Sequence, residues 1–277
     1  DGVRCSYSYA APNTLEVLEA RKGNTEIWVN DAMGMLGRLP DFVASMTVGV
    51  YDLRHELEKL NPELSKNAES YLQYARQNDL CLSHGLHDPC MDKSLRPPED
   101  PDRCVRVVKE RDDGIIVRGA RFNTFGLFSN EIMICPTYGF KPEEKEYAMW
   151  FTVPCDAPGL SQIARESYGG RDPLDHPASA VYDEVDSLIV FDDVFIPWER
   201  VFLYREPVMA NQLFRSGVMT WASFAGGSLS ILRMEILCAI AEMLAKTSGI
   251  IKRPEVVAKL GEMCTDRKST RLNSSHH

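Results

Sequence analysis

Apolar side chains in residues 13–80 recur at intervals of three and four, the spacing of one face of a helix. Asn13 or Thr14 can cap the first of these helices. Pro40 starts a second helix, and residues 67–79 form a further one. The apolar positions of these predicted helices are Leu15, Leu18, Ile27, Val29, Phe42, Val43, Met46, Val50, Tyr71, Leu72 and Ala75.

The pattern changes at Leu82, where short apolar runs separated by Pro and Gly replace the helical period. Residues 105–110 and 114–119 flank Arg111-Asp112-Asp113 like the arms of a hairpin. The region therefore reads as a β domain. Its further predicted strands cover residues 131–135, 147–153, 187–191 and 201–203.

After Pro207 the helical period returns, with an apolar stripe from Leu229 to Leu244 and a second helix over 256–263. These helices are too few to bury their own apolar faces, so we expect further chain or partner subunits to cover them. The order predicts an α+β fold. Its expected segments are 1–82 (helical), 83–206 (β), 207–267 (start of a helical bundle) and 268–277 (a tail).

Both ends of the chain look incomplete. The first residues lack an initiator Met and the layout of a signal peptide, so the sequence reads as the interior of a longer chain. Residues 268–277 have no apolar period and resemble a translated sequencing adapter. We therefore expect no folded element there, and we do not interpret the terminal His pair as a metal site.

Composition and charge narrow the class of protein. The 277 residues, 44% hydrophobic and 26% charged, suit one or two globular domains and exclude a disordered or collagen-like chain. With 40 acidic and 31 basic residues the net charge is −9, the wrong sign for binding nucleic acid or an anionic membrane. No run of 18 apolar residues predicts a transmembrane helix. Eight cysteines without a CxxC pair predict reduced thiols in a cytoplasmic protein.

Four potential metal ligands, Cys81, His84, His87 and Cys90, stand at intervals of three. Thiolate and imidazole suit zinc, but structural zinc sites pair their ligands across two separated knuckles. We therefore favour a chance arrangement of residues at a helix end over a metal site. One of the histidines is a better candidate for a proton donor, because its charge changes near neutral pH.

Three further stretches could carry chemistry. Arg38 stands just before the helix start at Pro40, where it could hold a phenolate, a carboxylate or a flavin carbonyl, or simply cap a turn. Residues 118–126 could place a hydroxyl against a flat ring, although edge strands look the same. The acidic run at 182–186 is more typical of a solvated turn than of a calcium loop. The common nucleotide and hydrolase fingerprints are absent, so spacing alone leaves the function open.

Four strings taken together resemble the 4-hydroxyphenylacetate 3-hydroxylase family. They are residues 35–42 (MLGRLPDF), 78–89 (NDLCLSHGLHDP), 112–120 (DDGIIVRGA) and 190–202 (VFDDVFIPWERVF), and the resemblance runs from about Ala11 to Arg205. It implies an acyl-CoA-dehydrogenase-like architecture, with an N-terminal helical domain, a central β-barrel and a C-terminal bundle that assembles into a homotetramer. Family members are close to twice this length, which implies a chain truncated at both ends.

The resemblance implies one of two chemistries. In the oxygenase branch, reduced FAD from a separate reductase reacts with oxygen, and a flavin hydroperoxide hydroxylates a phenol ortho to its hydroxyl; FMN is an alternative flavin. In the 4-hydroxybutyryl-CoA dehydratase branch, three Cys and one His hold a [4Fe-4S] cluster. This chain has Leu39 and Met35 where two of those Cys would stand, and no His near Trp221 and Ser228. The oxygenase branch is favoured, with the lyase and an inactive, flavin-free or zinc-binding fragment as rivals.

The resemblance also implies roles for individual residues. Arg38 and His84 match catalytic positions, where a cation favours the phenolate and an imidazole carries the phenol proton. Phe42 stands where hydroxyphenylacetate hydroxylases have a Tyr, and Thr137 and Tyr138 match a polar pair beside the substrate carboxylate. The implied flavin contacts are His84, then Cys90, Asp92 and Lys93 in the loop that begins at Asp88 and Pro89, and finally Asn123 and Thr124.

Overall fold

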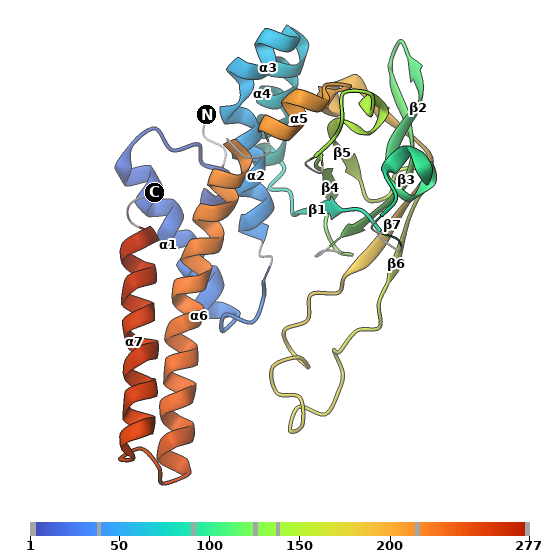
Figure 1. The fold of residues 1–277 in the computed structure, drawn as a ribbon. Coiled ribbons are helices and arrows are strands. Elements are labelled where there is room, and N and C mark those ends of the chain that lie inside the picture. Colours follow the sequence, from blue (N-terminus) through green and yellow to red (C-terminus); the bar gives the residue numbers. More distant parts are fainter. Residues whose placement is uncertain are drawn as a thin grey trace.

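The computed structural model places helices against one side of a twisted mixed sheet, with a long helical hairpin extending away from both (Figure 1). The order of elements is helical, then β, then helical, which confirms the predicted α+β fold. The structure describes residues 4–37, 40–89, 92, 94–123, 127–136, 139–213 and 217–274.

Capping residues mark the starts of two of the N-terminal helices. The Thr14 side chain accepts a hydrogen bond from the Val17 amide at the start of the first long helix. Asn61 accepts one from the Glu63 amide in the same way, and Pro62 occupies the first turn that follows. After the short 3-10 turn Tyr7–Tyr9, the helices are α1 (Leu15–Asp31), α2 (Pro40–Asp52), α3 (Arg54–Leu60) and α4 (Pro62–Gln77).

The sheet has eight strands in the order β6-β7-β3-β1-β4-β5-β8, with β2 paired to β3. Among the described pairings β1 and β4 run parallel and the rest antiparallel, and the predicted hairpin is confirmed as β2 and β3. Among the described residues, these pairings form a continuous path from β6 to β8. The strands are β1 (Leu82–His87), β2 (Arg106–Arg111), β3 (Gly114–Asn123), β4 (Glu131–Ile134), β5 (Met149–Pro154), β6 (Leu160–Ala164), β7 (Ser187–Pro197) and β8 (Val201–Tyr204).

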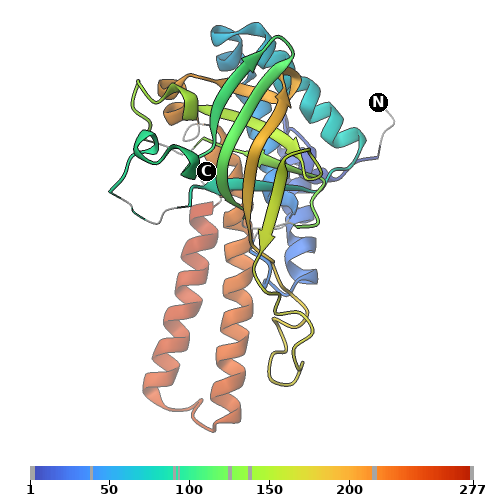
Figure 2. The same cartoon turned by 90° about the vertical axis from the view of Figure 1, so that its right-hand side faces the viewer.

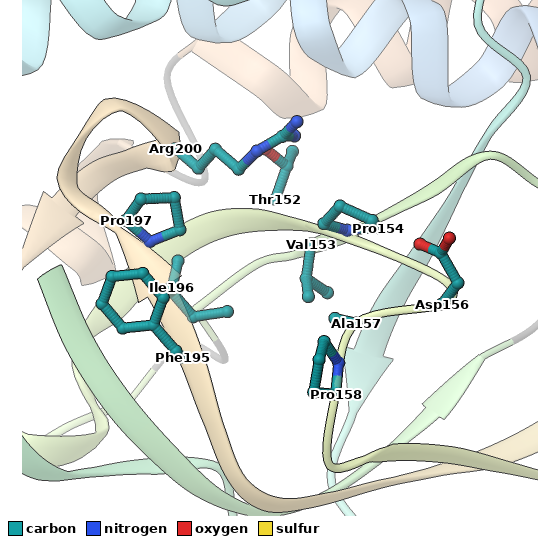
Figure 3. Close-up of a pocket in the computed structure, with 10 residues that line it drawn as sticks. All are labelled: Thr152, Val153, Pro154, Asp156, Ala157, Pro158, Phe195, Ile196, Pro197 and Arg200. Carbon is teal, nitrogen blue, oxygen red and sulfur yellow. The ribbon is translucent and has the colours of Figure 1, made fainter.

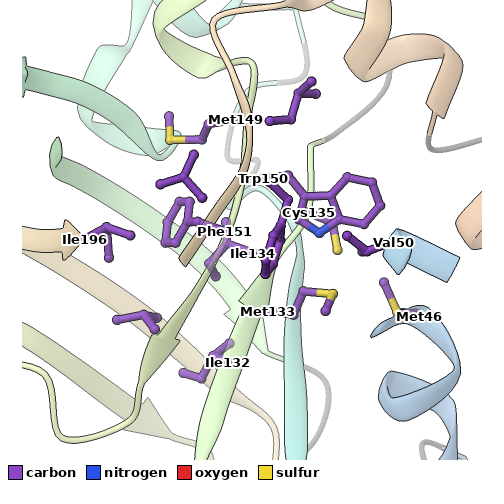
Figure 4. Close-up of a cluster of buried hydrophobic side chains, with 14 of the residues drawn as sticks. Met46, Val50, Ile132, Met133, Ile134, Cys135, Met149, Trp150, Phe151 and Ile196 are labelled. Carbon is purple, nitrogen blue, oxygen red and sulfur yellow. The ribbon is translucent and has the colours of Figure 1, made fainter. Parts of the chain in front are cut away.

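Both faces of the central strands are buried. In Figure 4, Met133 and Cys135 point toward Met46 and Val50 of α2, while Ile132 points to the opposite side. This arrangement explains why all four residues of β4 are buried, since a strand covered on both faces has no solvent-facing register. The core therefore lies on both sides of the sheet, and α2 seals one of them.

The chain ends in α5 (Pro207–Leu213), α6 (Met219–Thr247) and α7 (Pro254–Ser274). Far along the hairpin, α6 leaves apolar side chains exposed, among them Met243 at 67% and Leu244 at 63%. The absence of a folded element after residue 267 was predicted wrongly: α7 continues to Ser274, since extending a formed helix costs little. In the part of the chain that the structure describes, no helix could span a membrane.

Candidate active site

His84 and Phe42, two of the predicted site residues, lie together. His84 sits in the middle of β1, paired with Met133 of β4, and its side chain is only 1% exposed. The rings of Phe42 and His84 have centroids 5.5 Å apart and planes tilted by 54°. An imidazole so placed is shielded from bulk water by an aromatic ring contributed by α2.

Buried polar contacts fix the turn of α2 that carries Phe42. The Asp41 carboxylate is 2% exposed and accepts a hydrogen bond of 2.6 Å from the Thr25 hydroxyl on α1. Arg21 of α1, 1% exposed, donates to the Ser45 hydroxyl one turn further along α2 at 2.5 Å. Burial lowers the pKa of the Arg21 guanidinium, while the charge of Asp41 opposes that shift. Sequence reasoning missed Arg21, because nothing in the local pattern distinguishes it from the other charged residues of α1.

The segment that leads to Arg38 is held by two distant elements. Gly34, which adopts a positive φ of 67°, presents its carbonyl to the Arg233 guanidinium of α6 at 2.5 Å. A Cβ added at Gly37 would lie 3.3 Å from the Glu184 carboxylate of the β6–β7 loop. Arg38 itself lies outside the described residues; before it, Arg233 binds the Gly34 carbonyl and Gly37 lies close to the Glu184 side chain.

Asn123, a predicted flavin contact, points away from His84. Asn123 pairs with Gly85, so its side chain shares a face with Gly85 and Ser83, and His84 occupies the opposite face. The Asn123 amide donates to the Ser83 hydroxyl and to Gln162, both at 3.3 Å, and Ser83 continues the chain to Ser129 at 2.8 Å. The described contacts thus place Asn123 in a buried polar network inside the sheet.

The face of the sheet that carries His84 also carries an uncovered apolar row. Phe122 is opposite Leu188, and Leu188 is opposite Ile163, so the three side chains line up across β3, β7 and β6. Phe122 is 43% exposed and Ile163 is 61% exposed, whereas α2 covers the neighbouring part of this face. An exposed apolar surface on the same face of the sheet as a buried imidazole suits a planar ring system with polar edges.

Asp92 is the implied flavin contact in the loop after Asp88 that the structure describes, and its carboxylate contacts are local. It accepts hydrogen bonds from the Ser94 amide and hydroxyl, and these lower the pKa of the Asp92 carboxyl. Arg103, in the 3-10 turn Pro101–Arg103 that precedes β2, donates to the Asp92 carbonyl at 2.7 Å and so ties the loop to that turn. The remaining predicted site residues lie outside the described residues, and they are Arg38, Cys90, Lys93, Thr124, Thr137 and Tyr138.

The suggested zinc ligands are not at a helix end, as the sequence analysis expected, but on and before a strand. His84 is buried whereas His87, which follows the irregular pairing between Gly85 and His87, is exposed. Within the described ranges, no group of three or more His, Cys, Asp or Glu residues is placed to hold a metal.

A cavity of about 360 Å³ opens between β5 and β7, apart from the predicted site (Figure 3). Prolines and the Phe195 ring form most of its wall, and Arg200 and Asp156 provide its charges. Behind it, the buried Glu131 carboxylate pairs with Arg200 and accepts a hydrogen bond from the Tyr71 hydroxyl. None of the predicted site residues that the structure describes lines this cavity.

Comparison with known proteins decides the family. The family description "4-hydroxyphenylacetate 3-hydroxylase N terminal" matches residues 1–203. The chain belongs to this family. Among curated relatives, the oxygenase component of 4-hydroxyphenylacetate 3-monooxygenase of Thermus thermophilus is 31% identical over 267 residues, which are 95% of this chain and 55% of the relative. The chain thus spans about half the length of the curated relatives it matches.

Solved structures agree with the assignment to the 4-hydroxyphenylacetate 3-hydroxylase family. The oxygenase component of 4-hydroxyphenylacetate 3-monooxygenase, complexed with FAD and 4-hydroxyphenylacetate, superposes with a TM-score of 0.88 at 30% identity, covering 97% of this chain and 56% of the other. Butyryl-CoA dehydrogenase of Megasphaera elsdenii, at a TM-score of 0.57 and 15% identity over 85% of this chain and 57% of the other, shares the fold alone. The acyl-CoA-dehydrogenase-like architecture is confirmed.

The dehydratase branch is also represented. The 4-hydroxybutyryl-CoA dehydratase/vinylacetyl-CoA-Δ-isomerase of Clostridium aminobutyricum is 33% identical over 225 residues, which are 77% of this chain and 45% of the relative. Sequence identity alone therefore does not separate the two chemistries, and the residues of the site must do so.

Proposed function

We propose that the full-length protein to which this chain belongs is the oxygenase component of a two-component monooxygenase that hydroxylates a phenol ortho to its hydroxyl. A separate reductase supplies reduced FAD, with FMN as the alternative flavin. The observation that carries the proposal is the contact of the buried His84 with Phe42, on the same face of the sheet as an uncovered apolar surface, in a chain of this family. We further propose a cytoplasmic homotetramer, since the described cysteines are free thiols and α6 leaves an apolar face exposed.

The lyase alternative lacks the residues that its cluster requires. Leu39 and Met35 stand where that branch has two cysteines, and the stretch from Trp221 to Ser228 contains no His. A [4Fe-4S] cluster depends on such thiolate and imidazole ligands. The monooxygenase is therefore the better supported of the two activities.

The residues present fit a flavin. Its planar ring would lie on the row formed by Phe122, Leu188 and Ile163, with His84 on the same face of the sheet. When bound in its reduced form, the flavin supplies two electrons, so that one oxygen atom of O₂ enters the phenol and the other leaves as water.

His84 and Phe42 contribute separate properties to this reaction. The His84 imidazole would accept a hydrogen bond from the phenol hydroxyl and take up its proton, which raises electron density at the ortho carbon. Phe42 would exclude water from the imidazole, because its ring covers that side of His84.

The proposal is tested with the full-length protein, reduced FAD, oxygen and a panel of phenols including 4-hydroxyphenylacetate. Catechol formation, followed by chromatography, is the expected result, and no catechol from any phenol would refute the proposal.

His84→Ala should slow hydroxylation while leaving the flavin Kd nearly unchanged. His55→Ala is the matched control, because His55 lies on α3, away from the sheet, with an exposed side chain. Equal catechol rates for His84→Ala and His55→Ala would contradict the role assigned to His84.

A further inference from the structure

Arg121 of β3 is a charged residue on the buried face of the sheet. Its side chain is 2% exposed and shares that face with Val117 and Gly119, two positions apart along the strand. Moving a guanidinium out of water is unfavourable unless a charged or hydrogen-bonding partner offsets the lost hydration. The polar contacts of the Arg121 guanidinium therefore show what offsets its burial.

Arg121 crosses the neighbouring strand β1 beside Gly85, the residue after His84. A Cβ added at Gly85 would lie 3.1 Å from the Arg121 Cβ and 2.6 Å from the Ile134 Cδ1. The absence of a side chain at Gly85 therefore lets the Arg121 side chain lie across β1. On the far side, Arg121 Nη1 lies 2.7 Å from the Asp88 carboxylate and donates to the Leu86 carbonyl at 3.4 Å.

These contacts coincide with a bulge in β1. Gly85 is opposite Asn123 but His87 is opposite Phe122, so β1 holds one extra residue between two pairs. Leu86 is that extra residue, and Arg121 binds its carbonyl. The guanidinium thus fixes the point where β1 changes direction, between His84 and the loop that begins at Asp88.

We propose that Arg121 is a positioning residue that holds the bulge of β1, so that His84 and the loop after Asp88 keep the spacing that flavin and phenol require. This inference rests on the proposed function. Arg121 itself stays on the opposite face of the sheet from His84 and acts through Asp88 and the β1 backbone. A planar guanidinium can satisfy a carboxylate and a carbonyl together, whereas a Lys ammonium provides only a point charge.

A purely structural role makes a different prediction. Replacing a buried ion pair by apolar side chains of similar size is often neutral or stabilising. If the Arg121–Asp88 pair only supported the fold, Arg121→Met combined with Asp88→Leu would leave catalysis unchanged in a folded protein. If the pair positions the bulge, the same double variant should fold and still lose coupling between flavin oxidation and hydroxylation.

The experiment uses the full-length protein and four variants: Arg121→Met, Arg121→Lys, Arg121→Met/Asp88→Leu, and the control Arg118→Met. Arg118 lies on the same strand and pairs with Asp193 at 2.6 Å, but its side chain is 41% exposed and remote from the bulge. Three quantities are measured for each: the flavin Kd from fluorescence quenching, kcat and KM for the phenol, and catechol formed per reduced flavin consumed.

Arg121→Met and the double variant should raise the flavin Kd and lower kcat by about tenfold, with a smaller change in KM and at least half of the catechol yield lost. Arg121→Lys should recover part of the yield, and Arg118→Met should match the unmodified protein. If Arg121→Met fails to fold, the double variant and Arg121→Lys provide the test of the positioning role.

Equal yields and flavin Kd values for the double variant and Arg118→Met would overturn the positioning role alone. An unmodified protein that binds flavin and makes no catechol would instead refute the proposed function, and the inference with it.

Discussion

Removing the Glu131 carboxylate should destabilise the sheet more than removing any exposed acid. Glu131 begins β4 and is 3% exposed; it accepts a hydrogen bond of 2.9 Å from Tyr71 and pairs with Arg200. Burial, followed by the charge of Glu131, raises the pKa of the Tyr71 hydroxyl well above its ordinary value, so Tyr71 stays a neutral donor. Glu131→Leu leaves both donors without their acceptor.

The magnitude follows from burial. Breaking a buried ion pair by removing one partner costs about 3–5 kcal/mol, and the Arg200 side chain retains 19% exposure, so the lower end, about 3 kcal/mol, applies. For a chain of this size that loss lowers the midpoint of thermal unfolding by about 6–12 °C. The exposed pair of Arg118 and Asp193 provides the matched control, and Asp193→Asn should cost less than about 1 kcal/mol.

The assay is thermal unfolding of the chain by circular dichroism for Glu131→Leu, Asp193→Asn and the double variant Glu131→Leu/Arg200→Leu. The double variant should unfold at a higher temperature than Glu131→Leu, because it no longer buries an uncompensated guanidinium. Equal midpoints for Glu131→Leu and Asp193→Asn, or a double variant less stable than Glu131→Leu, would refute the reasoning.

Three other outcomes are expected. Gly85→Ala should lower the free energy of unfolding by about 1–3 kcal/mol, since the new Cβ would lie 2.6 Å from Ile134 Cδ1; unchanged urea unfolding would contradict the close packing. The hydrogen bond from Arg165 lowers the pKa of Asp183 to about 2, so the stability gained over Asp183→Asn should be complete above about pH 4 and vanish as the pH falls toward 2; thermal midpoints with a constant offset would disprove this. Burial raises the pKa of the Cys104 thiol to about 11, so iodoacetamide at pH 8 should label it only after unfolding, as peptide mass analysis would show.

The sequence predicted where helices and strands lie along the chain better than which strand side chains share a face of the sheet. The β2–β3 hairpin and the starts of the helices follow from local turn and cap residues, and the structure confirms them. The strand β6 (Leu160–Ala164) escaped prediction, because three of its five side chains are exposed and its apolar pattern is weak. Its position depends on pairing with β7, and the local sequence of β6 does not reveal that pairing.

The candidate site was predictable as a set of residue types but not as an arrangement. Phe42 and His84 are 42 positions apart, and their contact depends on how α2 packs on β1. Asn123 and His84 were grouped together on the flavin, yet strand register places their side chains on opposite faces. Arg121 had no local signal for its role, since its partner Asp88 is brought to it only by the bulge.

Strand alternation gives β1 two separate tasks at adjacent positions. His84 is on the face of the sheet that carries α2 and the apolar row, where a proton acceptor can meet an aromatic substrate. Ser83 and Gly85 necessarily point to the opposite face. A one-residue slip of β1 would exchange the two sets of side chains and move the proton acceptor to the opposite face of the sheet. The contact of Arg121 with the bulge opposes such a slip, because the guanidinium holds the Leu86 carbonyl and the Asp88 carboxylate in one register only. The buried charge is therefore better explained by the register of the site than by the stability of the sheet.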